Sequence, residues 1–147
     1  MLGILRKLAQ ALAAQDTPRQ LAAGFALGAA AGLIPKSSLF SHLLLIVLAA
    51  SQANFATGFV AAALFSALGA PLAPLLHPIG AALLTSGALR PLWTWAYNLP
   101  IVPWTRFNNT VVLGSLLAGA AIAYPLYLGM IPVFEKYSET IGARLRK

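Results

Sequence analysis

The sequence predicts an all-α integral membrane protein with a single domain over residues 1–147. Hydrophobic residues make up 59% of the chain and charged residues only 9%, whereas soluble domains have about 25% charged residues. No Asp, Glu, Lys or Arg occurs between Ser37 and Leu89 or between Phe107 and Phe134. Because charges keep the outer faces of soluble folds wetted, gaps of this length favour lipid surroundings. The expected parts are short broken or re-entrant helix hairpins, an interfacial aromatic loop, one long C-terminal transmembrane helix and amphipathic helices at both ends.

The charge balance and the missing residue types exclude several kinds of site. The net charge of +7 comes from ten Lys and Arg residues, mostly near the ends and turns, which indicates anionic headgroups and topology rather than nucleic acid. The absence of cysteine excludes disulfides and thiolate metal sites. His42 and His77 are the two histidines, and neither predicted hairpin contains an acidic residue. We therefore expect no metal site and no cofactor, and expect each imidazole to hydrogen-bond a neighbouring helix or a headgroup.

The first segment, residues 1–15, is predicted to be an uncleaved amphipathic helix in the membrane interface. Its apolar and polar residues fall on opposite arcs of a helix. Arg6 and Lys7 interrupt the apolar residues, whereas a signal peptide has its charges before the apolar run. An ordinary soluble amphipathic helix is the alternative.

The next segment, residues 17–51, is predicted to be a hairpin of two short helices. Thr17 as N-cap, Pro18 at the first helical position and Gln20 in a capping box start a helix that ends near residue 34. Glycines recur every fourth residue along one face of this helix, at Gly24, Gly28 and Gly32. Such a face allows another helix to approach at backbone distance. We expect it to pack against a helix of the same chain, with self-association into a homo-oligomer as the alternative.

The elbow of this hairpin, residues 35–38, determines how deep the hairpin lies. The helices before and after it are ~25 Å and ~21 Å long, against a hydrocarbon core of ~30 Å. The pair therefore either crosses a locally thinned bilayer at a tilt or enters and leaves by the same face. Lys36 is then a functional cation at membrane depth or a headgroup anchor. Ser37 and Ser38 lie at the start of the second helix, where free N–H groups favour an anion such as a lipid phosphate.

A second unit, residues 54–87, repeats the pattern of a helix, a proline elbow and a helix. Gly58, Pro71, His77 and Ser86 follow their counterparts in the first unit at offsets of 34 to 36 residues. Repeated broken helices form the midplane site of many membrane transport folds. We expect the stretch from Leu72 to Pro78, which lies among three prolines, to be kinked or unwound.

The segment over residues 88–107 combines three Trp, one Tyr and three Pro between Arg90 and Arg106. Trp and Tyr gather where a membrane meets water, so we predict an interfacial loop. Two arginines are too few for single-stranded nucleic acid.

Asn108 or Asn109 is predicted to cap the last helix, which runs from Thr110 to about Phe134. At ~38 Å it is the one predicted segment long enough to span a bilayer unaided, although two prolines must bend it. Residues 135–147 then form an amphipathic tail with a basic end, which should lie on the surface that the N-terminal helix occupies.

The basic residues at both ends predict that both termini are cytoplasmic. The number of crossings must then be even. If both predicted hairpins crossed the membrane twice, four crossings would precede the last helix, and the total of five would be odd. Hence either one hairpin is re-entrant or one predicted hairpin is a single kinked span.

Two stretches resemble a family of uncharacterised bacterial inner-membrane proteins: TPRQLAAGFALGAAAGLIP, which begins at Thr17, and LRPLWTWAYNLPIVPWTRFNNTVVLGS, which ends at Ser115. The wider domain of unknown function shares the opening of helix, Pro and helix, and the most specific segment is Thr105–Thr110. The resemblance implies a bacterial inner-membrane location and a larger AsmA-like partner, encoded nearby and implicated in moving phospholipid across the periplasm. It supplies no catalytic residues. Arg106, Asn108 and Asn109 match its motif. These three residues either cap the helix and contact a headgroup, or form a site that binds a partner or a lipid headgroup.

Three functions follow from these observations. The first is a non-enzymatic inner-membrane component of phospholipid transport that docks an AsmA-like partner and helps to load or deliver lipid. The second is a self-sufficient oligomeric transporter or flippase, with His42 and His77 lining a path. The third is a membrane enzyme acting on lipid headgroups, for which no paired acid and base can be assembled. The expected lipid-headgroup or partner-binding residues are Lys36, Ser37, Ser38, Arg90, Arg106, Asn108 and Asn109.

Overall fold

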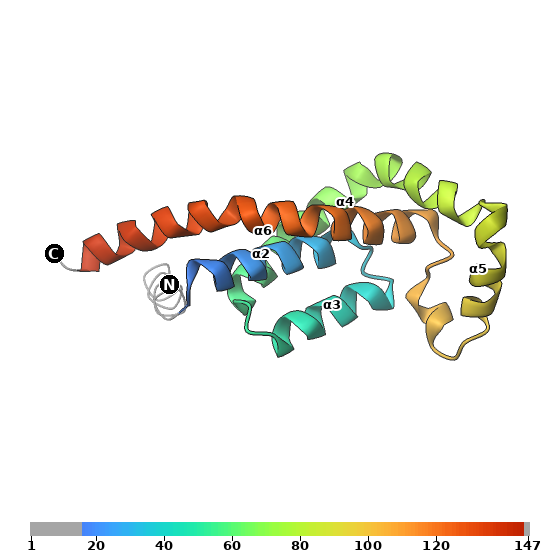
Figure 1. Cartoon of the computed structure of the whole chain (residues 1–147), viewed down its shortest axis with the longest axis horizontal. Helices are drawn as coiled ribbons and strands as arrows, with labels where there is room; N and C mark the ends of the chain where they lie inside the picture. Colours follow the sequence, from blue (N-terminus) through green and yellow to red (C-terminus); the bar gives the residue numbers. More distant parts are fainter. Residues whose placement is uncertain (1–15, 146–147) are drawn as a thin grey trace.

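The computed structural model describes residues 16–145, and all regular structure in this part of the chain is helical. The helices are α2 (Pro18–Leu33), α3 (Leu39–Ala50), α4 (Phe55–Leu84), α5 (Arg90–Tyr97) and α6 (Thr110–Leu145). Two short 3-10 helices, η1 (Gly87–Leu89) and η2 (Val102–Thr105), flank α5 (Figure 1). The all-α prediction is confirmed. The interfacial helix predicted over residues 1–15 lies outside the described residues.

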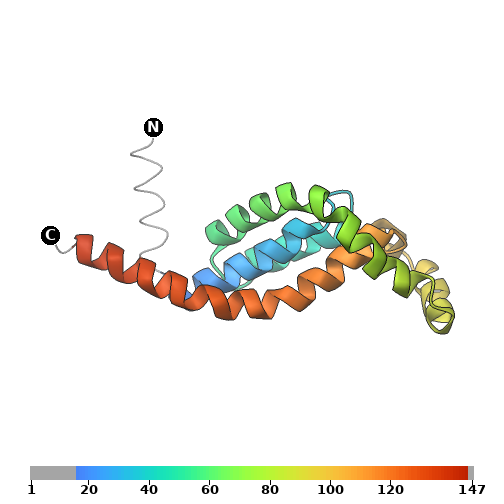
Figure 2. The same cartoon turned by 90° about the horizontal axis from the view of Figure 1, so that it is seen from above.

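Helix α2 is the centre of the bundle, with α3, α4 and α6 packed around it (Figures 1 and 2). The predicted capping box is confirmed, because the Gln20 N–H donates to the Thr17 hydroxyl at 3.3 Å and the Thr17 N–H donates to the Gln20 side chain at 2.9 Å. Most of α2 is Ala and Gly, and its residues from Gly28 to Leu33 are all buried. Small side chains let three neighbours approach one helix, so α2 forms the core.

The glycine face of α2 packs against the first half of α4 in the same chain. A Cβ atom at each glycine would collide with α4 backbone, because Gly24, Gly28 and Gly32 face the carbonyl oxygens of Asn54, Gly58 and Ala62. Residue numbers rise together along this contact, so the two helices run parallel. The prediction of close packing within the chain is therefore confirmed.

The prediction of a second hairpin is wrong, because α4 runs without interruption through the expected elbow. Pro71, Pro74 and Pro78 all lie inside the helix and are all exposed. Their spacing of three and four residues places them on one face, where the missing N–H groups cost few hydrogen bonds. The helix therefore curves instead of breaking (Figure 2).

Beyond its prolines, α4 leaves α2 and crosses the start of α6. A Cβ atom at Gly80 would collide with the Thr110 carbonyl, and one at Gly114 with the Leu76 carbonyl. Numbers fall along α6 as they rise along α4, so this second close contact is antiparallel. Helix α4 thus has one glycine contact on each side of its proline segment.

Two further boundaries differ from the prediction. The segment over residues 88–107 contains the helix α5 and is only in part a loop, because Trp93 and Tyr97, one turn apart, both pack on Phe107. The expected tail over residues 135–147 is no separate helix as far as Leu145, because α6 continues through Glu135. Its sequence there has no glycine or proline from residue 133 to 141 to stop the helix.

The four longer helices, α2, α3, α4 and α6, each run between the same two ends of the molecule. The start of α2 and the last turns of α6 lie at one end, and α5 with the start of α6 lies at the other (Figure 1). Helices α2, α3, α4 and α6 therefore alternate in direction. Of the two arrangements that the parity argument allows, this is the one in which a predicted hairpin is a single kinked segment.

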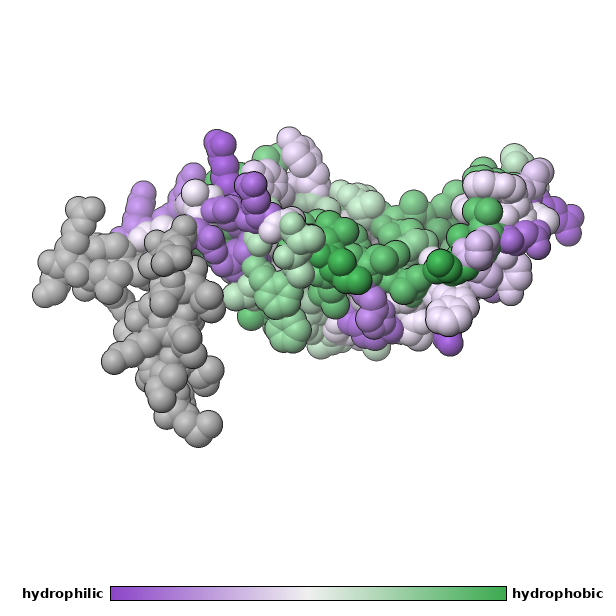
Figure 3. Space-filling view, turned by 90° about the horizontal axis from the view of Figure 1, so that it is seen from below, coloured by the Kyte–Doolittle hydropathy of each residue, from purple (hydrophilic) through white to green (hydrophobic). Residues whose placement is uncertain are grey.

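Between Asp16 and Leu145, two helices are long and apolar enough to cross a membrane. Within the most apolar 18 residues of each, only 17% of α4 and 28% of α6 is buried, whereas the core helix of a soluble protein would be mostly buried. The sequence predicts one segment long enough to span a bilayer, the helix α6, and the structure adds α4 as a second helix of sufficient length. Figure 3 shows a hydrophobic band between hydrophilic ends, with one small hydrophilic patch at its lower edge.

Candidate functional site

The elbow after α2 and the loop before α6 meet, although they are far apart in the sequence. The Ser38 hydroxyl, which is fully buried, donates to the Thr105 carbonyl at 2.5 Å. The predicted residues around Lys36 and those around Asn108 therefore belong to one end of the bundle. Neither Ser38 nor Thr105 carries a sequence signal for this pairing.

Lys36 closes the C-terminal end of α2 with its own side chain. Its ammonium donates to the Ala31 carbonyl at 2.7 Å and to the Ser41 hydroxyl at 2.9 Å, with weaker contacts to Gly32 at 3.5 Å and Ile34 at 3.4 Å. The last carbonyls of a helix have no donor within the helix and carry partial negative charge. Lys36 therefore has a capping role that the sequence did not predict.

This elbow lies outside both long helices, and burial lowers the pKa of the Lys36 ammonium from its usual value. The Ser38 hydroxyl also accepts from the Phe40 N–H at 3.2 Å, which makes Ser38 the N-cap of α3. Since Ser38 donates to Thr105 as well, its hydroxyl is occupied by protein groups. Ser37 is exposed beside it, so an anion at this helix start would meet Ser37 rather than Ser38.

The motif before α6 divides into a cap and two exposed side chains. The Asn109 side chain accepts from the N–H groups of Val111 at 2.9 Å and Val112 at 3.2 Å, so Asn109 is the cap. Asn108 and Arg106 are exposed. Arg106 adopts a left-handed conformation with φ of 55°, which turns the chain sharply between the buried Thr105 and Phe107.

The histidines do not share a site. The His42 Nδ1 atom lies 3.0 Å from the Ser38 carbonyl within its own helix, and the His77 Nδ1 atom lies 2.6 Å from the Thr110 hydroxyl on α6. The expectation of a hydrogen bond to a neighbouring helix is confirmed for His77, whereas His42 bonds the residue that caps its own helix. No group of three metal-ligating residues occurs between Asp16 and Leu145.

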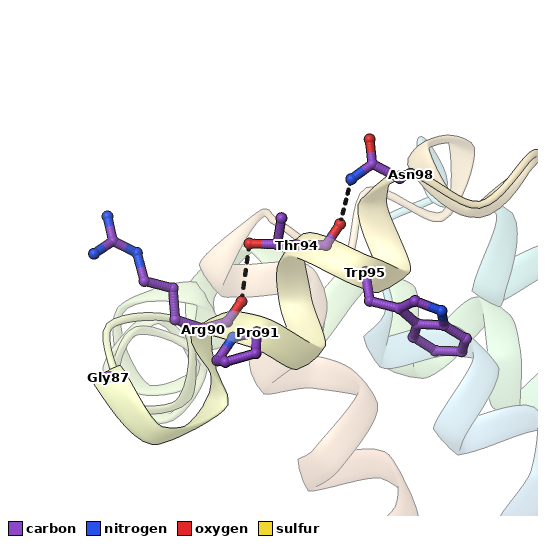
Figure 4. A pocket seen from close by; sticks show the side chains of 6 residues that line it. All are labelled: Gly87, Arg90, Pro91, Thr94, Trp95 and Asn98. Atoms are coloured by element: carbon purple, nitrogen blue, oxygen red, sulfur yellow. Dashed lines mark hydrogen bonds between the residues drawn. The ribbon is translucent and has the colours of Figure 1, made fainter.

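Arg90 begins a polar row on α5. The Thr94 hydroxyl donates to the Arg90 carbonyl at 3.0 Å, and the Asn98 amide donates to the Thr94 carbonyl at 2.7 Å. The three side chains follow one another along the helix, while Trp95 points away from this row (Figure 4). Together with Gly87, Pro91 and Trp95 they line a shallow hollow.

Two large apolar side chains project from the loop between α5 and α6. Ile101 is 67% exposed and Trp104 is 76% exposed. Ile101 has φ of 74°, a conformation that a β-branched residue rarely adopts. The backbone thus holds these side chains outward at the α5 end of the bundle.

Over the residues that the structure describes, the chain is all-helical, with two helices long and apolar enough to cross a membrane and a polar, aromatic end. Over 127 residues, which make up 86% of this chain and 78% of the other, the sequence is 32% identical to an uncharacterized protein of Treponema pallidum (strain Nichols). The chain belongs to the same family as this protein. No protein-family model matches the sequence, and no solved structure matches it.

Proposed function

We propose that the chain is an integral protein of a bacterial inner membrane, with both termini cytoplasmic and the α5 end on the periplasmic side. The proposal is supported by the low burial of the apolar helices α4 and α6. It is also supported by the bias of basic residues, since Arg19 and Lys136 lie at the opposite end and the sequence has further basic residues before Arg19 and after Lys136.

The α2–α3 hairpin then crosses the bilayer instead of turning within it. At the start of α2 the Asn54 N–H donates to the Gln20 carbonyl at 2.9 Å, and the Asn54 amide donates to Asp16 at 2.5 Å. At the elbow Ser38 bonds Thr105 beside the start of α6. The hairpin is thus tied to both polar ends of the bundle. Because its helices are shorter than the ~30 Å hydrocarbon core, the bilayer around it is thin.

The function that this arrangement supports best is a non-enzymatic component of phospholipid transport. The carrying observation is the separation of charge, because the three acidic residues of the sequence, Asp16, Glu135 and Glu139, all belong to the terminal end. Of the charged residues that the structure describes, only Lys36, Arg90 and Arg106 lie at the α5 end, beside exposed Trp side chains. Cations without carboxylates, next to interfacial aromatics, suit lipid phosphates.

The periplasmic position of this end suits a partner that takes lipid away from the membrane. The resemblance supplies the class of that partner, a larger AsmA-like protein. The same separation of charge disfavours a headgroup enzyme, because no carboxylate lies near the α5 end to act as acid or base. A self-sufficient transporter is also disfavoured, since His42 and His77 have separate partners and α2 packs on α4 at backbone contact.

Purification from native membranes in mild detergent tests the function. We expect phospholipid and a large periplasmic protein to remain bound, and we expect Arg106→Gln to lose more of both than the control Lys136→Gln at the opposite end. If neither lipid nor partner is retained while the protein alone moves a solute into liposomes, the proposal fails and the transporter is correct.

Cysteine labelling tests the topology, since the chain has no cysteine of its own. Asn98→Cys should react with an impermeant maleimide in spheroplasts, whereas Gln52→Cys should react only after the membrane is opened. Both residues are exposed and lie at opposite ends of the bundle. Equal reaction of both variants in sealed spheroplasts would refute the assigned orientation.

A further inference from the structure

An aromatic recess lies between the end of α4, helix α5 and the loop before α6. It encloses about 350 Å³, and its walls include Trp93, Tyr97 and Phe107, with Asn98 and Asn108 at its polar side. The recess is separate from the elbow at Lys36 and from the cap at Asn109.

The rings are held in fixed positions before any ligand arrives. Phe107 is 5% exposed and stands between the other two, with ring centroids 5.7 Å from Trp93 and 6.2 Å from Tyr97. The Trp93 indole N–H donates to the Leu83 carbonyl at 3.0 Å, which fixes the ring against the end of α4. Tyr97 remains 51% exposed at the opening.

Grouped aromatic rings recognise alkylammonium groups, because the negative faces of the rings attract a cation. The charge of this end does not favour a simple cation, since Arg90 and Arg106 would repel it and no carboxylate of the sequence lies nearby. A zwitterion avoids that repulsion when its anionic part faces the arginine. The recess and its charged neighbour therefore complement a ligand of both signs.

Arg90 is placed to meet the anionic part. Thr94 and Asn98 line both the aromatic recess and the hollow that Arg90 lines, so the two cavities adjoin across α5. Arg90 lies one helical turn from Thr94, and its guanidinium can pair with a phosphate through two N–H groups.

We propose that this recess binds the headgroup of a zwitterionic phospholipid, with the ammonium against Trp93, Tyr97 and Phe107 and the phosphate on Arg90. The inference rests on the proposed lipid-transport function and names its substrate class. It implies that the protein prefers phosphocholine or phosphoethanolamine headgroups to phosphoglycerol.

The test is calorimetric titration of the full chain in dodecyl maltoside with short-chain lipids. Dihexanoyl phosphatidylcholine, dihexanoyl phosphatidylglycerol and free phosphocholine serve as probes, the last to separate a lipid site from a site for the free headgroup. We expect the choline lipid to bind at least tenfold more tightly than the glycerol lipid, and free phosphocholine to bind more weakly than the intact lipid.

Tyr97→Leu removes a ring at the opening while it keeps apolar volume, and Tyr137→Leu on α6, a tyrosine of similar exposure that lines neither cavity, is the matched control. We expect Tyr97→Leu to lower the affinity for the choline lipid about tenfold, with little change for the glycerol lipid and none for the control. Equal binding of both lipids by the unchanged protein, or unchanged choline binding by Tyr97→Leu, overturns the inference. If one of these two results is found but the protein still binds lipid, only the headgroup inference fails and the transport proposal is unaffected. If the purified protein retains neither lipid nor partner, the transport proposal itself fails.

Discussion

Replacement of Lys36 by Met tests whether this cation is a structural cap of α2. The variant keeps a side chain of similar length and removes the donors to the Ala31 carbonyl and the Ser41 hydroxyl. If the geometry determines its role, the main effect falls on stability. A residue that only anchors the chain to headgroups would leave the folded bundle unchanged.

The expected loss follows from two short hydrogen bonds. A hydrogen bond to a charged group contributes about 1.5–3 kcal/mol, and a cation at a helix C-terminus about 0.3–1 kcal/mol. Ser41 also donates to the Ala31 carbonyl at 3.0 Å, so that carbonyl keeps one partner in the variant. The net loss should therefore be about 2 kcal/mol, near the lower value for a single charged bond. For a chain of this size that corresponds to a fall in Tm of about 4–8 °C.

Thermal unfolding in detergent micelles, followed by circular dichroism, measures this change. Lys136→Met on α6 is the control, and we expect it to stay within about 0.5 kcal/mol of the parent because Lys136 is exposed within a helix and caps no helix end. Lys36→Arg should recover part of the loss, since it retains the charge. If Lys36→Met melts with the parent protein but binds less phospholipid, the capping argument is wrong and Lys36 is a headgroup ligand.

Two further predictions concern helix packing and capping. Gly28→Ala would press a methyl group against the Gly58 carbonyl, so we expect a loss of about 1–3 kcal/mol in the free energy of unfolding. Gly129→Ala on α6 meets nothing within 4 Å and should be neutral or slightly stabilising; an equal loss in both variants would contradict the packing argument. Asn109→Ala should cost about 1 kcal/mol by removing the cap of α6, whereas Asn108→Ala should cost little, and the reverse order in thermal melts would assign the cap to Asn108.

Local signals predicted the helix starts well. The sequence predicts the capping box at Thr17, a helix start at Ser37 and Ser38, and a cap at Asn108 or Asn109, because caps depend on hydrogen bonds within three residues, which sequence spacing determines. The glycine face of α2 was predictable for the same reason, because its period is that of the helix. The helix that packs on this face, α4, was not predictable, since helical spacing indicates which face of α2 is small but not which helix packs against it.

The candidate site was predictable only as separate pieces. The contact between Ser38 and Thr105 joins residues 67 positions apart, and no local pattern encodes it. The carbonyls that surround the Lys36 ammonium are backbone groups, which every sequence has. The aromatic recess is not predictable from the sequence, because the sequence predicts a loop around Trp93 and Tyr97, where a spacing of four residues has no structural meaning.

The two proline segments show what breaks a helix in apolar surroundings. A break exposes up to four N–H and four carbonyl groups, and in lipid each needs a partner from the protein. The first elbow supplies such partners, since Lys36 bonds the carbonyls that end α2 and Ser38 accepts from the Phe40 N–H. The second segment, from Pro71 to Pro78, contains one polar side chain, His77, and that side chain is paired with Thr110.

A continuous helix is therefore the less costly solution for α4. Proline has no N–H, so its presence inside a helix leaves no unsatisfied donor and frees only the carbonyl four residues before it. Three such carbonyls on one curved face cost less than the backbone groups exposed by an elbow without caps. The prediction of a second hairpin from the repeated prolines is thus wrong, because capping side chains, rather than prolines, determine where these helices end.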